Sequence, residues 1–154
     1  QQPSGLFAID YDTAQGKRRA LYTQFENSDA RRFVPCWDEP GIKAVFSISV
    51  EAPAGEMTVS NMPEARTVPL PGGRRLVTFA DTPKMSSCLM FLGLGDFERI
   101  HRKVGDVAVG VIVRRGASDQ AAFDLDAAAG LLGYYTSVAM GMKMHRVPVP
   151  APAA

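Results

Sequence analysis

Residues 23–40 read TQFENSDARRFVPCWDEP. They gather acidic, basic, amide and aromatic side chains more densely than any other segment of the chain. If residues 21–26 are extended, successive side chains alternate between two faces. Gln24 and Glu26 then point the same way, and Phe25 points into the core. An amide oxygen beside a carboxylate can accept hydrogen bonds from an ammonium group. This stretch therefore predicts a strand end that presents two polar side chains to a ligand.

A short helical turn is predicted next, at residues 31–33. The Asn, Ser and Asp side chains of residues 27–29 are suited to cap this turn, and Pro35 ends it because proline has no backbone N–H. Carboxylates and guanidinium groups follow at spacings that allow ion pairs, which would tie the turn to the loop after it. The residues expected in these structural roles are Asp29, Arg31, Arg32, Asp38 and Glu39, with Phe33 and Trp37 as core anchors.

Outside this stretch, the chain shows the two-residue period of β-strands up to about residue 113. Residues 5–11 and 18–26 are separated by a turn and predict a hairpin. Residues 44–51 alternate between apolar and polar side chains, as in a half-buried antiparallel strand, and the apolar residues 87–94 predict a central strand covered on both faces. Closely spaced turn signals favour an antiparallel β-sandwich or curved sheet. Further short strands are expected at residues 57–60, 65–68, 74–79, 97–102 and 107–113.

The period becomes helical between Ser118 and Met140, and Ser118 or Asp119 is expected to cap the start of this helix. Apolar residues recur there at intervals of three or four, namely Phe123, Ala127, Leu131, Tyr134 and Val138. Residues 142–154 are rich in Pro and Ala and predict an extended tail.

Composition and charge limit the classes of function. The net charge of the 154 residues is +1, so we expect neither a nucleic-acid nor a membrane partner. No run of 18 apolar residues and no signal peptide is visible. Cys36 and Cys88 are expected to be buried thiols, and a disulfide between them stays open. His101 and His145 are far apart and no H-E-x-x-H motif occurs, so neither a metal site nor a catalytic residue is predicted.

Several short motifs occur in one order along the chain. They are TQFE, DARR and WDEP within residues 23–40, then VSNMP at 59–63, TPKMS at 82–86 and GLGDFE at 93–98. In these motifs the chain, from about residue 5 to 135, resembles the aminopeptidase N family of zinc metallopeptidases. The resemblance implies an incomplete N-terminal domain of that family, an antiparallel β-sandwich or saddle-shaped sheet, followed by one C-terminal α-helix. The implied ranges are 1–115 for the β-domain, 116–141 for a helix resembling the start of the catalytic domain and 142–154 for the tail.

The same resemblance implies roles for two residues. Gln24 would help to line the pocket for the first side chain of a peptide, and Glu26 would receive its free α-amine. Peptide N-termini would bind in a cleft shared with a catalytic domain that this chain lacks. Zinc belongs to the complete family enzyme, and no cofactor is expected in this chain. Two alternatives stay open: Glu26 could instead pair structurally with Arg31 or Arg32, and the chain could be a stand-alone β-sandwich that binds a partner protein without enzymatic activity.

The ends of the chain depart from the resemblance. After Tyr135 the chain keeps only a glycine of the segment that continues the family's helix, and the family's earlier strands are absent before Gln1. We therefore expect a fragment, either a truncated or frameshifted gene product or a shortened piece of a longer protein.

Overall fold

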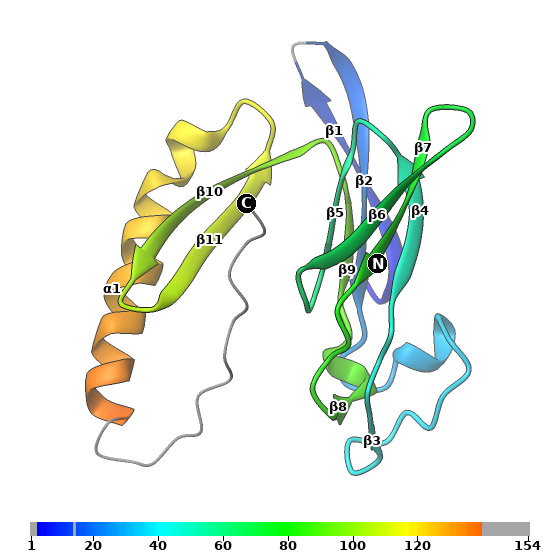
Figure 1. Cartoon of the computed structure of the whole chain (residues 1–154), viewed down its shortest axis with the longest axis horizontal. Coiled ribbons are helices and arrows are strands. Elements are labelled where there is room, and N and C mark those ends of the chain that lie inside the picture. The colour runs from blue at the N-terminus through cyan, green and yellow to red at the C-terminus, as the bar shows by residue number, and fades with distance from the viewer. Residues whose placement is uncertain (1–2, 14, 140–154) are drawn as a thin grey trace. The chain divides into compact units, whose positions relative to one another are not determined.

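The computed structural model describes residues 3–13 and 15–139, which form two compact units, Gln1–Asp96 and Phe97–Ala154. Antiparallel strands dominate the described chain, and one long helix follows them (Figure 1). The predicted class, mainly β with one C-terminal helix, is confirmed.

The first unit contains a four-stranded antiparallel sheet in the order β1-β2-β9-β5. Its strands are β1 (Gly5–Thr13), β2 (Gly16–Gln24), β9 (Leu92–Gly95) and β5 (Met57–Ser60). The first two strands form the predicted hairpin, in a register that places Gln24 opposite Gly5. The end of β2, where the two candidate ligand-binding residues begin, is therefore held in a regular sheet.

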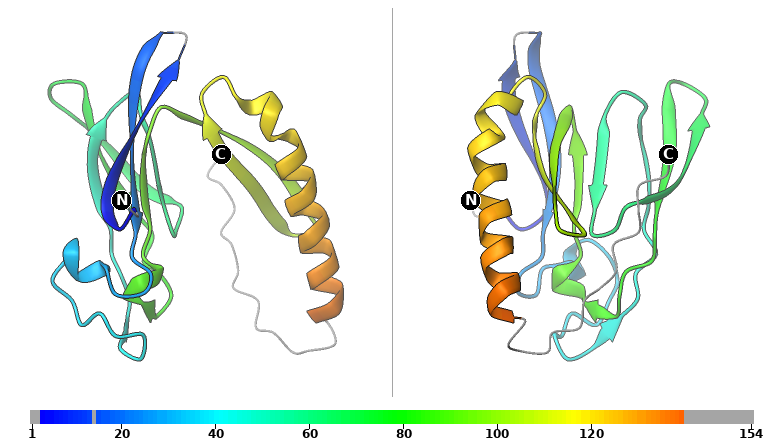
Figure 2. Two further views of the ribbon diagram at one scale, coloured as in Figure 1. Left: turned by 180° about the vertical axis from the view of Figure 1, so that it is seen from behind. Right: turned by 60° about the vertical axis from the view of Figure 1, so that its left-hand side comes forward.

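A second sheet of the first unit has the order β4-β7-β6, with β4 at Ser49–Pro53, β7 at Arg74–Phe79 and β6 at Glu64–Leu70. The two-residue strands β3 (Lys43–Ala44) and β8 (Met85–Ser86) pair with each other. Figure 2 shows the four-stranded and three-stranded sheets as separate layers. The predicted short strands are thus present, arranged in antiparallel sheets.

A hydrophobic cluster lies beneath residues 23–40. Phe25 is 1% exposed and is buried together with Ala30 and Met90. Partly buried apolar side chains pack against these three, namely Val34, Cys36, Phe46, Ile48 and Met85. The prediction that Phe25 points inward is confirmed, and the same stretch supplies both core residues and exposed polar residues.

The predicted central strand at residues 87–94 is only half right. Residues Ser87–Leu89 form a 3₁₀ turn, η2, and the strand β9 begins only at Leu92. The Asn61 side chain donates to the Leu89 carbonyl at 2.8 Å and accepts from the Phe91 N–H at 2.7 Å. These side-chain bonds replace a strand ladder, so the segment turns and leaves Leu89 60% exposed. The shorter strand β9 nevertheless lies in the interior of its sheet, between β2 and β5.

The predicted strand at residues 44–51 is interrupted. Strand β3 ends at Ala44 and β4 begins at Ser49, although burial alternates through the gap as expected. The Phe46 N–H donates to the Thr82 hydroxyl at 2.9 Å instead of to a neighbouring strand's carbonyl. A polar side chain therefore satisfies the backbone where the strand pairing is broken.

The second unit is a hairpin with a helix along it (Figure 1). Strands β10 (Phe97–Val104) and β11 (Val107–Arg114) pair, then η3 (Ser118–Ala121) leads into α1 (Ala122–Ala139). An ion pair between Arg102 of β10 and Asp126 of α1 joins the layers. The predicted helix is confirmed up to Ala139, whereas Met140 and the predicted tail lie outside the described residues. Within the described residues, no helix has the length and apolar character needed to cross a membrane.

Large apolar residues of the helical period are exposed to solvent. Among the described side chains of α1, Leu125 is buried at 7% exposure, but Phe123 is 78%, Leu131 56% and Tyr134 62% exposed. Val138 is not among the side chains that the structure describes. The helical period was therefore predicted correctly, and the stripe that carries it lies at the surface of this chain.

The predicted cap of the helix is wrong. The N-cap residue of η3 is Ala117, not Ser118 or Asp119, and Ala117 makes no side-chain capping bond. Instead, Oε1 of Glu98 in β10 accepts the N–H groups of Gly116, Ala117 and Ser118, at 2.9, 3.1 and 3.0 Å. Desolvation raises the pKa of Glu98, but these hydrogen bonds, together with one from the Ser118 side chain, outweigh it and hold the pKa below its usual range. A carboxylate distant in sequence therefore accepts the backbone N–H groups at the start of η3, a role that an N-cap side chain usually has.

We expect Glu98→Ala to loosen the start of the helix, because the Gly116 and Ser118 N–H groups lose their acceptor and the Ala117 N–H keeps only the Arg114 carbonyl. Their amide protons should exchange faster with solvent, and the melting temperature should fall. Glu98→Gln keeps an acceptor oxygen without the charge and should fall between Glu98→Ala and the wild type. Hydrogen exchange followed by NMR measures this, with Asp106→Asn in the β10–β11 turn as the control. Unchanged exchange at residues 116–118 in Glu98→Ala would contradict the capping role.

Candidate functional site

The candidate site begins where β2 ends. Gln24 is the last residue of β2 and is exposed, Phe25 is buried, and Glu26 is exposed again. The Glu26 N–H donates to Gln24 Oε1 at 2.9 Å, and the Glu26–Asn27 peptide bond is cis. One lone pair of the Gln24 amide oxygen is thus used locally. The Gln24 NH₂ group has no hydrogen-bond partner in the region that the structure describes, so it can act as a donor. The two polar residues lie together at the surface, as the alternation predicted.

The carboxylate of Glu26 has no hydrogen-bond or ion-pair partner in the part of the chain that the structure describes. Arg31 binds Asp38, and Arg32 donates to Ser4 Oγ at 2.6 Å and to Asp29 Oδ1 at 3.4 Å. The alternative that pairs Glu26 with one of these arginines is therefore not the arrangement found. Glu26 presents an exposed negative charge beside an amide.

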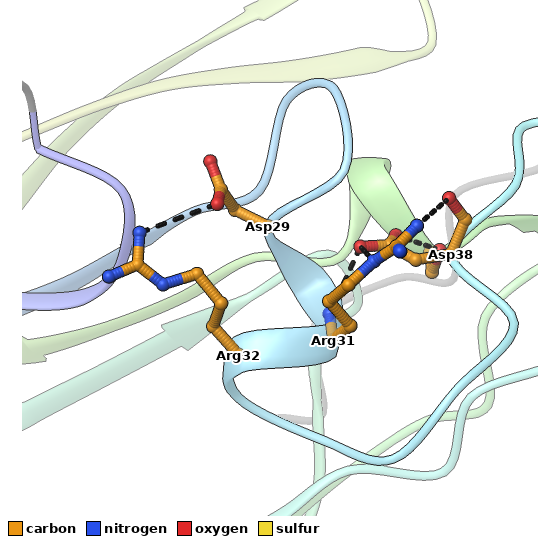
Figure 3. Close-up of polar contacts among 5 residues, drawn as sticks. Asp29, Arg31, Arg32 and Asp38 are labelled. Carbon is orange, nitrogen blue, oxygen red and sulfur yellow. Dashed lines mark hydrogen bonds and ion pairs between the residues drawn. The ribbon is translucent and has the colours of Figure 1, made fainter.

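Asp38 is the buried acid of this region, with its side chain 1% exposed. Its Oδ2 accepts the Arg31 backbone N–H at 3.0 Å and the Arg31 Nε at 3.4 Å, while Oδ1 accepts the Ser87 hydroxyl at 2.8 Å. Figure 3 shows Arg31 reaching across to Asp38, and Arg32 directed at Asp29. The predicted ion pair between turn and loop is confirmed for Arg31 and Asp38, whereas the Arg32–Asp29 pair stays within the turn.

Hydrogen bonds keep Asp38 ionised. Burial raises the pKa of Asp38, but bonds from the Arg31 backbone, the Ser87 hydroxyl and the Arg31 side chain, together with the Arg31 charge, outweigh burial and lower it. Ser87 was not identified from the sequence, because it lies 49 residues away from Asp38 and belongs to no local pattern. The buried carboxylate is therefore paired and hydrogen-bonded, as a charge in this position requires.

The predicted capping of the turn by residues 27–29 is wrong. The turn itself exists as η1 (Ala30–Arg32), and Asp29 occupies its N-cap position without a side-chain capping bond. The Arg31 N–H, which a local cap would bind, is taken by Asp38 from seven residues further on. The Asp29 carboxylate is thereby left to Arg32.

The prediction that Trp37 anchors the core is also wrong. Trp37 is 77% exposed, because its neighbours Cys36 and Asp38 point inward and leave the indole on the opposite side. Phe33 is 37% exposed and packs against Phe25 with ring centroids 5.4 Å apart, so it covers the core instead of filling it. The loop therefore holds a large aromatic side chain in solvent.

A zinc ion does not fit the residues of this chain that the structure describes. No group of three or more His, Cys, Asp or Glu side chains is placed there to hold a metal. Cys36 and Cys88 are free and half-buried, so the expectation of buried thiols is only partly met. No chemical step is assigned to a metal in this chain.

Comparison with known proteins gives this geometry a context. Residues 1–89 match the family model of the peptidase M1 N-terminal domain. Over 88% of this chain, the sequence is 37% identical to "Aminopeptidase N" of Acetobacter pasteurianus. It is 38% identical to "Probable aminopeptidase 2" of Sulfurisphaera tokodaii over 85% of this chain, and 33% identical to "Aminopeptidase M1" of Arabidopsis thaliana over 96% of this chain. The matches cover 38%, 16% and 16% of those relatives, so the chain spans only a minor part of their length.

Proposed function

This chain belongs to the peptidase M1 family, and we propose that it is the non-catalytic, substrate-side part of a longer zinc-dependent aminopeptidase that removes N-terminal residues from peptides. The observation that carries this proposal is the exposed Glu26 carboxylate, which has no partner among the described residues and lies beside the Gln24 amide. The zinc chemistry is implied by the family resemblance and would be supplied by residues outside this chain.

The chemistry of an aminopeptidase explains why such a carboxylate is useful. An aminopeptidase must recognise a free ammonium group, and a carboxylate is the side chain that binds an ammonium most strongly. We assign this role to Glu26. Gln24 would shape the pocket for the first side chain of the peptide through its amide. Both roles require a catalytic domain that closes the cleft and excludes water, so the isolated chain should bind peptide N-termini weakly or not at all.

The proposal also covers the organisation of the chain. We propose that residues 1–115 are part of the N-terminal β-domain and that residues 116–141 begin the catalytic domain, whereas the predicted tail at 142–154 lies outside the described residues. The exposed stripe of Phe123, Leu131 and Tyr134 supports the second range, because large apolar side chains on one helix face ordinarily pack against further structure. A single hairpin with one helix offers too little core to bury them.

A second candidate is a stand-alone β-module that binds a partner protein. The observation in its favour is the loop around the buried Asp38, where Trp37 is 77%, Ile42 49% and Val45 54% exposed. Exposed aromatic and aliphatic side chains held by a well-bonded loop are typical of protein interfaces. This candidate needs no zinc and no amine recognition by Glu26.

The genomic reading frame that contains this chain distinguishes the two candidates. An H-E-x-x-H segment within a few hundred codons of Ala154, in a protein that releases N-terminal residues from peptides, would support the aminopeptidase. A frame without that motif, whose product folds and binds another protein through the Trp37 loop, would support the β-module and contradict the enzyme proposal.

We expect the purified chain to be inactive by itself. It should not hydrolyse aminoacyl-anilide substrates and should not retain stoichiometric zinc after dialysis, because no ligand set is placed among the described residues. Absorbance of the released aniline and elemental analysis measure these outcomes. Zinc-dependent turnover that survives a second purification would contradict the assignment.

A further inference from the structure

We propose that Asp38 is a positioning residue, which fixes where Glu26 and Gln24 present their polar groups to the peptide amine. The inference rests on the proposed function. Asp38 itself touches no substrate in this scheme, because its side chain is buried and its oxygens are occupied by Arg31 and Ser87. It acts through the backbone of the turn that follows Glu26.

Two anchors hold the backbone on either side of Glu26. On one side, Gln24 is held in the β1–β2 register opposite Gly5. On the other side, the Asp29 N–H donates to the Phe25 carbonyl at 3.0 Å, which joins Phe25 to the start of η1. Residues 26–28 bridge these anchors, so a shift of the turn must also move Glu26.

The position of the η1 turn depends on hydrogen bonds to other parts of the first unit. A three-residue 3₁₀ turn has too few internal hydrogen bonds to keep its position alone. One tie to the rest of the unit is Asp38, which binds both the Arg31 N–H and the Arg31 side chain and is itself bound by Ser87 of η2. A second tie is the exposed hydrogen bond from Arg32 to Ser4 Oγ at 2.6 Å. Ala30 is fully buried and keeps the turn on the core. Loss of Asp38 should therefore displace the turn without unfolding it.

Displacement of Glu26 should weaken the binding of the peptide amine. A misplacement of about 1 Å in a binding constellation can cost up to roughly a hundredfold in efficiency. Because Gln24 is fixed by the sheet, the displacement falls on Glu26, and the loss should be largest for ligands that carry an α-amine.

The test uses the aminopeptidase that carries this segment, with Asp38→Asn as the main variant because it keeps the side-chain shape. Two competitive inhibitors are compared, a peptide analogue with a free amine and its des-amino counterpart. We expect Asp38→Asn to raise the inhibition constant of the amine analogue about tenfold to a hundredfold and to leave that of the des-amino analogue nearly unchanged. Asp10→Asn is the matched control, because Asp10 is also paired with an arginine, Arg19, but lies on the exposed β1–β2 hairpin.

A double-mutant cycle separates positioning from mere stability. If Asp38 acts through Glu26, adding Asp38→Asn to Glu26→Ala should change the inhibition constant by less than about twofold. In the present chain, labelled with ¹⁵N, the amide signal of Glu26 should shift in Asp38→Asn and not in Asp10→Asn. This second measurement needs no activity, so it applies even if a variant is a poor enzyme.

Each contrary outcome has a separate meaning. If the Asp38→Asn and Glu26→Ala effects multiply, or if both inhibitors weaken alike, Asp38 is only structural and the inference is overturned. An unmoved Glu26 amide signal would overturn it as well. If Glu26→Ala alone fails to discriminate the two inhibitors, the proposed function of Glu26 is wrong, and the positioning role for amine binding is overturned together with it.

Discussion

Glu26→Ala is expected to lower kcat/KM for free-amine peptides by about 30-fold or more in the enzyme that carries this segment. Losing the desolvated charge partner of an ammonium typically costs about 2–5 kcal/mol, and each 1.36 kcal/mol corresponds to a factor of ten. Glu26→Gln keeps the shape of the side chain and loses its charge, so it should lose much of the same amount. Steady-state kinetics with peptide substrates measures the change.

Substrates with a blocked α-amine provide the control for this prediction. With substrates whose amine is blocked, the loss caused by Glu26→Ala should shrink, because no ammonium is then present to bind. A structural role would give a different result, with a lower melting temperature and equal losses on both kinds of substrate. The arrangement found favours the binding role, since Arg31 and Arg32 have other partners and Glu26 has none among the described residues.

Asp38→Ala is expected to destabilise the first unit by about 2–4 kcal/mol. The substitution leaves the Arg31 N–H and the Ser87 hydroxyl without their acceptor, and each buried polar group left unpaired costs about 1–3 kcal/mol. The Arg31 guanidinium adds less, because its side chain is 55% exposed and water can replace the carboxylate. Urea denaturation followed by far-ultraviolet circular dichroism measures the change, because strands dominate the described chain.

Acid sensitivity provides an independent check on Asp38. Its pKa is lowered in the folded protein, so its contribution is fully present above the unfolded value of about 3.9. The contribution is lost as the pH falls below that value and through the folded pKa. The stability difference between the wild type and Asp38→Asn should therefore be constant near neutral pH and shrink below about pH 4. A difference that persists unchanged in acid would contradict an ionised Asp38.

A surface ion pair provides the control for the unfolding measurement on Asp38→Ala. Asp10 and Arg19 form a bond of 2.6 Å between side chains that are 55% and 66% exposed. Because water screens and solvates such a pair, Asp10→Ala should change the unfolding transition little. If Asp38→Ala were equally mild, the Asp38 network would not hold the turn.

The amino-acid sequence by itself determined the features that depend on neighbouring residues. Alternation of side chains placed Phe25 inside and Gln24 and Glu26 outside, and the change of period after Ser118 predicted α1. The β1–β2 hairpin followed from two strand patterns on either side of a turn. These features are local because the backbone period alone sets which way each side chain points.

Only the tertiary structure decided the features that join distant residues. Ser87 reaches Asp38 across 49 positions, and Glu98 caps a helix that begins about twenty residues later. No local pattern encodes such pairs, because chain folding brings their atoms together. The same reason explains the errors: the turn at residues 30–32 did not need its local cap once Asp38 was present, and Trp37 turned outward because Cys36 and Asp38 occupy the inner side.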